Sequence, residues 1–265
     1  IEAGGGCWLK TMSSRTVVHS VRSFSSAREV KALLPCALLM VLGLQATAQS
    51  LDTIDWRAVT PSTNKSTVRV AGGFTVEHAA ASPSVMAVVQ GTLRSGDHQN
   101  LPFVVVDKIH AQVLVFSGAG RWLGSAPALL GLARGDEAAP GLVDRPLSQI
   151  QPHERITPAG RFVAELDRNA AGQTILWVDY EQAISLHPVR SLNPKERRLE
   201  RLTSASLQDK RISYGCINVP AQFWRAVVLP AFRNTKGVVY VLPDSRPLHS
   251  VFPDLLHTTE KAVAN

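Results

Sequence analysis

The stretch Arg211-Ile212-Ser213-Tyr214-Gly215-Cys216-Ile217-Asn218-Val219-Pro220 carries the strongest chemical pattern in the chain. It places a cysteine directly after a glycine, which permits a tight turn and exposes backbone N–H groups. Such amides can hold the oxyanion of a tetrahedral intermediate. The alternative is a buried packing cysteine, because thiols are often inert core residues. The order of residues favours an activated nucleophile at Cys216.

The residues after Cys216 predict a helix over residues 221–229. Asn218 suits the N-cap of that helix, and Pro220 suits its first turn. A helix N-terminus just beyond a cysteine favours thiolate over thiol. We therefore expect Cys216 to be partly thiolate near neutral pH.

The segment Ser213-Tyr214-Gly215-Cys216-Ile217-Asn218 resembles the catalytic signature of the L,D-transpeptidases, the YkuD-type domain. That signature has Ser or Thr, usually His, then Gly-Cys, an apolar residue, and Asn or Arg. Upstream, residues 156–162 are similar to the family's Thr-Pro-x-Gly-x-Phe turn, and Ser185-Leu186-His187-Pro188 resembles its strand ending in the catalytic histidine. Residues 103–116 look like its opening strands. The resemblance covers residues 101–243 and implies a mostly β fold with the site at one end of a sheet.

The resemblance also implies a role for each residue of the motif. Cys216 would be the nucleophile and His187 its base, and the backbone amides of Gly215, Cys216 and Tyr214 would form the oxyanion hole. Ser213 and Asn218 would brace the loop, while the carbonyl of Pro188 would orient the imidazole. Among the histidines outside the leader, His187 is also the one that ends an apolar strand. A strand-end histidine with a purely structural hydrogen bond is the alternative for this residue.

This sequence departs from the family pattern in three places. Tyr214 replaces the usual histidine before Gly215, so any side-chain role there is lost or changed. Pro188 stands where the family often has Gly or Ser, but proline keeps its carbonyl. The step from His187 to Cys216 is 29 positions, longer than usual. A loop insertion costs little free energy, so the two residues can still meet.

The excess length lies in a basic block, residues 189–211. It holds seven Lys or Arg residues against three acids, a net charge of +4. Two interpretations stand: a solvated helix over residues 194–202, or a basic flap over the site that meets carboxylates or glycan of the substrate.

The first 48 residues resemble a secretory leader. Lys31 precedes a short apolar run over residues 32–44, and Ala46-Thr47-Ala48 forms an A-x-A cleavage site. An uncleaved membrane anchor is the alternative, although the run is too short for an ordinary span. Cleavage would leave 217 of the 265 residues, with Cys216 as the one cysteine. An exported thiol without a disulfide partner points to a catalytic role.

Net charge bears on the class of partner. The whole chain carries +7, and the leader holds five basic and two acidic residues, so the remainder carries +4. This mild basicity gives no case for nucleic acid and is compatible with a polyanionic envelope polymer.

Short strands with turn signals dominate the rest of the chain, which predicts a mainly β, sandwich-like fold with a few short helices. We expect a linker over residues 49–100 with a helix starting at Ser82-Pro83, a catalytic domain over 101–243, and an appended surface tail over 244–265. The expected strands cover residues 103–106, 111–116, 126–132, 162–166, 174–180, 183–187 and 237–242.

Together these features predict an exported cysteine L,D-transpeptidase that acts on peptidoglycan stem peptides through a thioester. It needs no cofactor, and the histidines show no metal-ligand spacing. Three alternatives remain: a Cys/His peptidase or amidase of the same fold, a catalytically inactive envelope-binding module, and a structural exported β domain.

Overall fold

The computed structural model describes residues 66–70, 74–78 and 81–256. The predicted leader therefore lies outside the described residues, as does part of the expected linker. Within the described ranges, no helix combines the length and apolarity needed to cross a bilayer.

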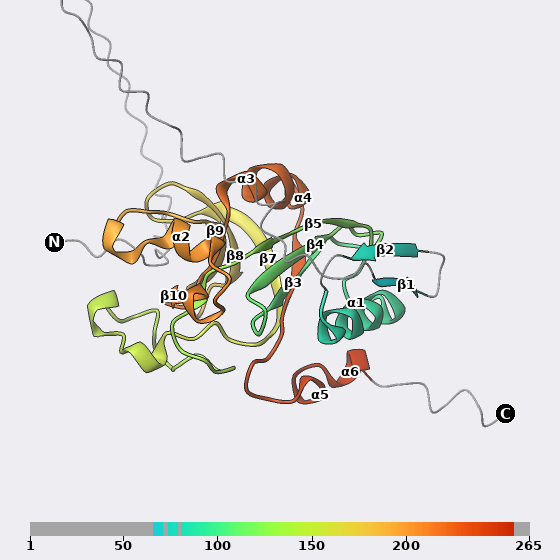
Figure 1. The fold of residues 1–265 in the computed structure, drawn as a ribbon, viewed down its shortest axis with the longest axis horizontal. Coiled ribbons are helices and arrows are strands. Elements are labelled where there is room, and N and C mark those ends of the chain that lie inside the picture. Colours follow the sequence, from blue (N-terminus) through green and yellow to red (C-terminus); the bar gives the residue numbers. More distant parts are fainter. Residues whose placement is uncertain (1–65, 71–73, 79–80, 257–265) are drawn as a thin grey trace, which may run out of the picture. The chain divides into compact units, whose positions relative to one another are not determined.

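The prediction of a mainly β fold with few short helices is confirmed. Eight strands form one mixed sheet in the order β11-β9-β8-β7-β12-β3-β4-β5 (Figure 1). Two neighbouring pairs are parallel, β12 with β3 and β11 with β9, and the others are antiparallel. The strands of this sheet are β3 (Phe103–Asp107), β4 (Gln112–Phe116), β5 (Trp122–Pro127), β7 (Gly160–Arg168), β8 (Thr174–Asp179), β9 (Ile184–Pro188), β11 (Ile217–Val219) and β12 (Gly237–Val241).

Two shorter pairings complete the strands of the described residues. β1 (Ser66–Val70) and β2 (Phe74–His78) form an antiparallel pair within the segment expected as a linker. β6 (Leu130–Gly131) pairs in parallel with β10 (Arg211–Ser213). The single strand expected over residues 126–132 is thus divided between β5 and β6. Proline has no N–H to donate to a ladder, so Pro127 is a natural end for β5.

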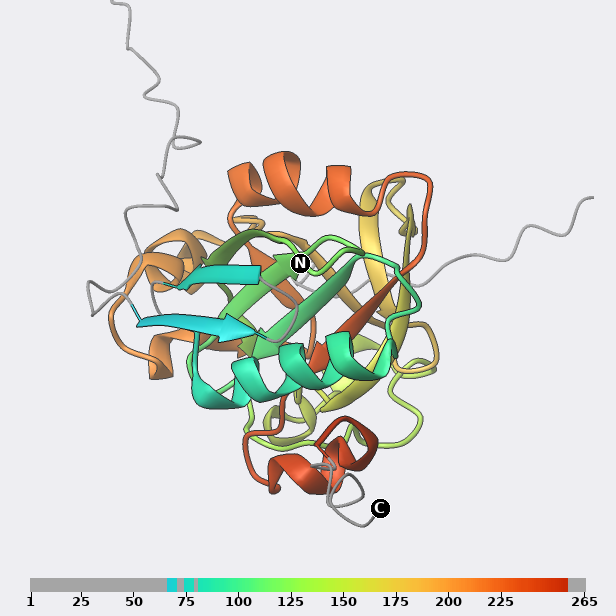
Figure 2. The same ribbon diagram turned by 90° about the vertical axis from the view of Figure 1, so that its right-hand side faces the viewer.

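Apolar side chains cover both faces of the sheet, because successive residues of a strand point to opposite sides. In β3, Val104 and Val106 join one core cluster, while Phe103 and Val105 join the other. The helical segment after Pro220 packs on the first cluster, and α1 (Pro83–Ser95) packs on the second with α5 (Leu248–Val251) and α6 (Pro253–Leu256). Figures 1 and 2 show these helices on opposite sides of the strands.

The expected helix start at Ser82-Pro83 is confirmed. Ser82 is the N-cap of α1 and accepts a hydrogen bond from the Val85 amide, and Pro83 occupies the first turn. The helix ends at Ser95, and its C-cap Gly96 has a φ of 68°, in the left-handed region that glycine tolerates best.

The expectation of a surface tail after Asp244 is wrong for its described part. Phe252 and Leu255 are 3% and 6% exposed and belong to the second core cluster. The Leu255 carbonyl passes so close to Gly91 of α1 that a Cβ there would lie 2.2 Å from it. Pro247 and Pro253 suggested an irregular surface segment, whereas each begins a short helix whose apolar residues close the core.

The helix predicted over residues 221–229 is confirmed in place but is not regular. It consists of α3 (Ala221–Phe223), a π-helical turn η6 (Trp224–Val228) and α4 (Leu229–Ala231). Pro230 cannot donate to the carbonyl four residues earlier, which removes one α-helical bond from this segment.

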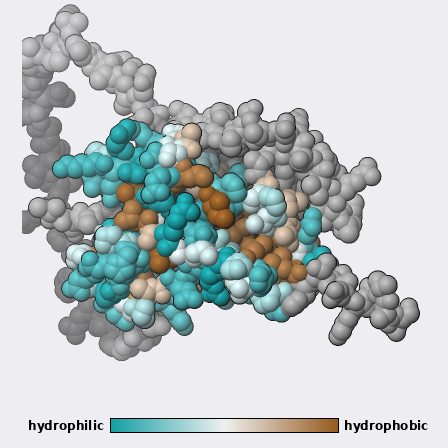
Figure 3. Space-filling view, turned by 60° about the horizontal axis from the view of Figure 1, so that its bottom comes forward, coloured by the Kyte–Doolittle hydropathy of each residue, from teal (hydrophilic) through white to brown (hydrophobic). Residues whose placement is uncertain are grey.

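Large apolar side chains reach the surface at a few positions. One face carries separate hydrophobic groups among mostly hydrophilic side chains (Figure 3). The exposed large apolar residues are Ile109, Trp122, Val163, Tyr180, Leu192 and Leu207.

Candidate active site

The candidate nucleophile lies in a tight loop between β10 and β11. Gly215 has a φ of 127°, which L side chains rarely adopt. A Cβ at this position would lie 2.7 Å from both the Ile156 carbonyl oxygen and the Ile184 Cδ1. Glycine is therefore required directly before Cys216.

Two buried hydroxyls hold this loop. The Ser213 hydroxyl donates to the Cys216 carbonyl at 2.6 Å and accepts from the Gly215 amide at 3.1 Å. The Thr157 hydroxyl donates to the Gly215 carbonyl at 2.8 Å and accepts from the Gly131 amide at 2.8 Å. The Thr-Pro turn is thereby connected to the Gly-Cys segment, 58 residues further along the chain.

Cys216 lies against the strand that carries His187. β11 pairs in parallel with β9, with Ile217 opposite Leu186 and Asn218 opposite His187. Ile217 and Leu186 both join the first core cluster. Side chains alternate along a strand, so Cys216, Asn218 and His187 share the opposite face.

The Cys216 sulfur has two neighbours that the sequence analysis did not single out. Ser185 Oγ lies 3.6 Å from Sγ, and the Ala183 carbonyl oxygen lies 3.6 Å from it on the turn before β9. Cys216 is 2% exposed. Ser185 could have been found from its place two residues before His187, which puts both side chains on one face of a strand.

Hydrogen bonds engage both ring nitrogens of His187. Nδ1 lies 2.9 Å from the carbonyl oxygen of Pro188, and Nε2 lies 3.2 Å from the side-chain nitrogen of Asn218. The same Asn218 nitrogen lies 3.4 Å from the Cys216 carbonyl oxygen. Asn218 therefore connects the candidate base to the backbone of the candidate nucleophile.

The expectation that Asn218 caps a helix is wrong. Asn218 belongs to β11, and its backbone forms two hydrogen bonds with Leu129 of 2.8 and 2.9 Å. The helix begins at Ala221 after Pro220, without a side-chain cap. A three-residue strand thus separates Cys216 from the helix, which removes the geometric basis for a thiolate stabilised by the helix N-terminus.

Tyr214 is half-buried and carries a cation on its ring. The guanidinium carbon of Arg155 lies 4.0 Å from the ring centroid. Arg155 also donates to the Ile150 carbonyl through Nε and Nη2, so the loop before β7 is attached beside the Cys216 loop.

Two other histidines, at positions 110 and 153, lie on other elements of the fold. His110 is exposed and its Nδ1 lies 2.8 Å from Asp107 Oδ2. His153 is exposed in the short 3-10 helix η3 (Pro152–Glu154). Neither lies on a strand that pairs with β11.

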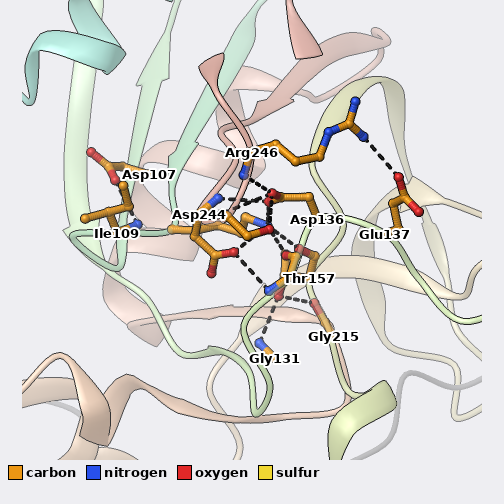
Figure 4. A network of polar contacts seen from close by, with 12 residues as sticks. Asp107, Ile109, Gly131, Asp136, Glu137, Thr157, Gly215, Asp244 and Arg246 are labelled. Atoms are coloured by element: carbon orange, nitrogen blue, oxygen red, sulfur yellow. Dashed lines mark hydrogen bonds and ion pairs between the residues drawn. The ribbon is translucent and has the colours of Figure 1, made fainter. Parts of the chain in front are cut away.

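A buried ionic cluster, defined as Lys108, Asp136, Arg211 and Asp244, lies beside the Thr157 segment that holds the loop (Figure 4). Lys108 Nζ donates to Asp136 Oδ1 at 2.7 Å, to the Gly135 carbonyl at 2.6 Å and to the Thr157 carbonyl at 2.8 Å. Arg211 Nη2 donates to Asp244 Oδ2 at 2.6 Å. Through Thr157, the cluster is connected to Gly215.

Burial and ion pairing shift the pKa values of this cluster in opposite directions. Burial lowers the pKa of Lys108, and its two aspartate partners offset only part of that effect. Burial would raise the pKa of Asp136, but hydrogen bonds from Lys108, Ser245 and the Asp244 amide outweigh it and hold that pKa well below its ordinary value. Asp136 therefore stays ionised.

The basic block is neither a plain solvated helix nor wholly exposed. Its helical part divides into η4 (Pro194–Glu196) and α2 (Arg198–Thr203), because Arg197 adopts a left-handed φ of 49°. Arg198, Lys210 and Arg211 are 2%, 4% and 4% exposed. Arg198 Nη1 donates to Asn218 Oδ1 at 2.7 Å, so the block contacts the candidate site directly.

Comparison with known proteins gives no family assignment. No protein-family model matches the chain, and no curated protein sequence does. Among solved structures, the chain is similar to the helical cell shape determining protein Pgp2 from Campylobacter jejuni, at 15% identity and a TM-score of 0.37, over 55% of this chain and 49% of Pgp2. It is also similar to the LD transpeptidase LdtMt1 in complex with imipenem, at 17% identity and a TM-score of 0.32, over 53% of this chain and 58% of that one. The chain thus spans about half the length of these proteins, and TM-scores of this size carry no argument about function.

Proposed function

We propose that this protein is an exported cysteine acyltransferase of the L,D-transpeptidase type that acts on peptidoglycan stem peptides. The observation that supports the proposal is that Cys216 directly precedes β11, whose Asn218 lies opposite His187 of β9, and that the Pro188 carbonyl orients His187. A nucleophile, a base and a group that orients the base are the parts that thiol acyl transfer requires. The substrate class comes from the resemblance of the residues around Cys216 to the family signature.

The reaction starts with transfer of the Cys216 thiol proton to Nε2 of His187, which exchanges its Asn218 contact for the thiol. The sulfur attacks the peptide carbonyl after the third stem residue. When the tetrahedral intermediate collapses, the C–N bond breaks, the His187 proton passes to the leaving amine, and D-alanine departs. The amine of a second stem then attacks the thioester, its proton passes to His187, and the sulfur regains a proton when the amide forms.

The oxyanion is held by backbone amides of the loop. The Gly215 amide already donates to the Ser213 hydroxyl. We therefore assign the amides of Tyr214 and Cys216 as the principal donors, with Gly215 fixing the turn that aims them.

The decisive experiment incubates the full chain with a stem tetrapeptide and follows the products by mass. We expect loss of D-alanine and a cross-linked or exchanged product, and a thioester on Cys216. Cys216→Ala should reduce product formation by at least about a thousandfold while the circular dichroism spectrum is unchanged. Equal product formation by Cys216→Ala would end the thiol hypothesis. Products that contain only added water would assign the hydrolase alternative.

One observation favours a second candidate, a catalytically inactive envelope-binding module. Cys216 is 2% exposed, and its sulfur lies against Ser185 and the Ala183 carbonyl. In a binding module the thiol stays closed to reagents even when stem peptide is present. Alkylation of Cys216 by a small thiol probe, with and without stem peptide, separates the two candidates.

The envelope location rests on the leader predicted over residues 1–48. N-terminal sequencing of envelope material should give a chain that starts after Ala48. A mature chain that keeps residues 33–44 would contradict export by cleavage and favour an anchor.

A further inference from the structure

We propose that Arg198 is a positioning residue that fixes the Asn218 side chain and, through it, the position of the proton on His187. The inference deepens the proposed function, since it assumes that His187 is the base of that reaction. It also gives a role to the basic block, in which Arg198 lies.

Arg198 reaches the site from α2 as a buried cation. It is 2% exposed, its Nη1 donates to Asn218 Oδ1 at 2.7 Å, and its Nε donates to Glu196 Oε2 at 2.5 Å. Glu196 is partly exposed, so the ion pair reaches the surface on one side. On the other side the guanidinium faces the amide that contacts both His187 and the Cys216 carbonyl.

The guanidinium determines which way the Asn218 amide points. An arginine can only donate hydrogen bonds, so the Asn218 atom that faces it must be the oxygen. The amide nitrogen must then face His187 Nε2 and the Cys216 carbonyl. Without such a donor, the two orientations of an asparagine amide differ little in shape, and the hydrogen-bond network alone selects one.

The same reasoning determines which ring nitrogen of His187 carries the proton. The Pro188 carbonyl can only accept, so Nδ1 of His187 carries a proton and donates to it. Nε2 faces the N–H of Asn218 and must accept, so it carries the lone pair. The hydrogen bonds therefore place a proton on Nδ1 of His187 and leave the lone pair of Nε2 facing the Asn218 side chain.

A contribution to the stability of the fold does not by itself explain why a buried arginine occupies position 198. Nη2 of Arg198 is buried and has no hydrogen-bond partner among the described residues. A buried donor without a partner costs free energy, and apolar residues often replace buried ion pairs at little cost. The contact that an apolar side chain could not supply is the bond to Asn218 Oδ1.

The test measures the tautomer of His187 directly. In the full chain labelled with 15N-histidine, the His187 signals, assigned by their loss in His187→Gln, should show a protonated Nδ1 and an unprotonated Nε2. Arg198→Ala should replace this single tautomer with a mixture, and added guanidinium ion should restore it. Arg201→Ala is the matched control, because Arg201 lies in the same helix but donates to the carbonyls of Glu196 and Asp209.

A second variant serves if Arg198→Ala does not fold. Asn218→Asp keeps the acceptor for Arg198 but replaces the amide N–H by a carboxylate oxygen, which favours a proton on Nε2 of His187. A folded Arg198→Ala that keeps the single tautomer, or an Asn218→Asp that leaves Nε2 unprotonated, would overturn the proposal.

Activity is a separate readout. Arg198→Ala should lower kcat by about tenfold or more, because a misplaced imidazole proton removes the base. If the wild-type chain transfers no acyl group but the tautomer responds as expected, the positioning role stands and the proposed function fails. If acyl transfer is present and unaffected in a folded Arg198→Ala, the positioning role fails and the proposed function stands.

Discussion

Lys108 and Arg198 are both buried cations near the Cys216 loop, and they are bound differently. Lys108 donates three hydrogen bonds, to one aspartate and two carbonyls, and a second aspartate lies 3.5 Å away. Arg198 donates to one carboxylate, that of Glu196, and to one amide oxygen, that of Asn218. Its Nη2 is buried without a hydrogen-bond partner among the described residues. Lys108 is connected to the loop backbone through Thr157, whereas Arg198 contacts the side chain that orients His187. Lys108 therefore stabilises the loop, whereas Arg198 orients the side chains that we propose take part in the reaction.

The largest stability effect should come from Lys108. Lys108→Met leaves Asp136 buried without its cation, and breaking a buried pair in this way costs about 3–5 kcal/mol. Urea unfolding measures the loss. Lys236→Met is the control, because Lys236 pairs with Glu165 across 3.5 Å at the surface and should cost under about 1 kcal/mol. If Lys108→Met were as stable as the control, Lys108 would not have the stabilising role that distinguishes it from Arg198.

The largest activity effect among the histidines should come from His187. His187→Ala removes the proposed base and should lower acylation of Cys216 by at least about a hundredfold. His153→Ala and His110→Ala should change it little, since both side chains are exposed and neither lies on a strand paired with β11. Acyl-enzyme formation followed by mass gives the rates. An equal loss in His153→Ala would contradict this assignment and indicate that His153, in the segment before β7, takes part as a base.

Most of the strands could be predicted from the sequence, because they follow from local patterns. Runs of β-branched and other apolar residues predicted β3, β4 and β12, and the Gly-Cys motif located a loop whose glycine has a positive φ. Asn218 was assigned wrongly, because an asparagine shortly before a proline suits a helix cap as well as a strand end. The strand pairing with His187 and the bond to Arg198 are long-range contacts that no local pattern encodes.

The ionic cluster was missed for a related reason. Lys108, Asp136, Arg211 and Asp244 are spread over more than 130 positions, and charged residues at such spacing suggest a solvated surface. Only the fold brings them together. The packing of Phe252 and Leu255 on α1 is likewise invisible until the sheet and helix are placed.

Acid should weaken the support under the loop. The pKa of Asp136 is depressed in the folded state, so its contribution to stability is complete above the ordinary aspartate value of about 3.9 and is lost as the pH falls below it. The free energy of unfolding should therefore fall as the pH drops below about 4. Asp136→Asn should be less stable at neutral pH and show a flatter acid dependence. An unchanged acid slope in that variant would assign the effect to other carboxylates.

The smallest effect should come from Tyr214, which occupies the position of the family's histidine. Its ring lies under the Arg155 guanidinium at 4.0 Å, a geometry worth about 0.5–1 kcal/mol near the surface. Tyr214→Ala should lose that much stability, and Tyr214→Phe should lose less, because the ring remains.

Acyl transfer should change by less than about threefold in both Tyr214 variants, because the proposed role of this residue uses its backbone amide, which the substitutions keep. A double-mutant cycle with Arg155→Ala isolates the pair, since two residues in contact show non-additive losses. A hundredfold loss of transfer in Tyr214→Phe would instead place the phenol hydroxyl in the chemistry. The Tyr214 side chain would then act in the reaction, as we propose for Arg198, and not only in the stability of the loop, as we propose for Lys108.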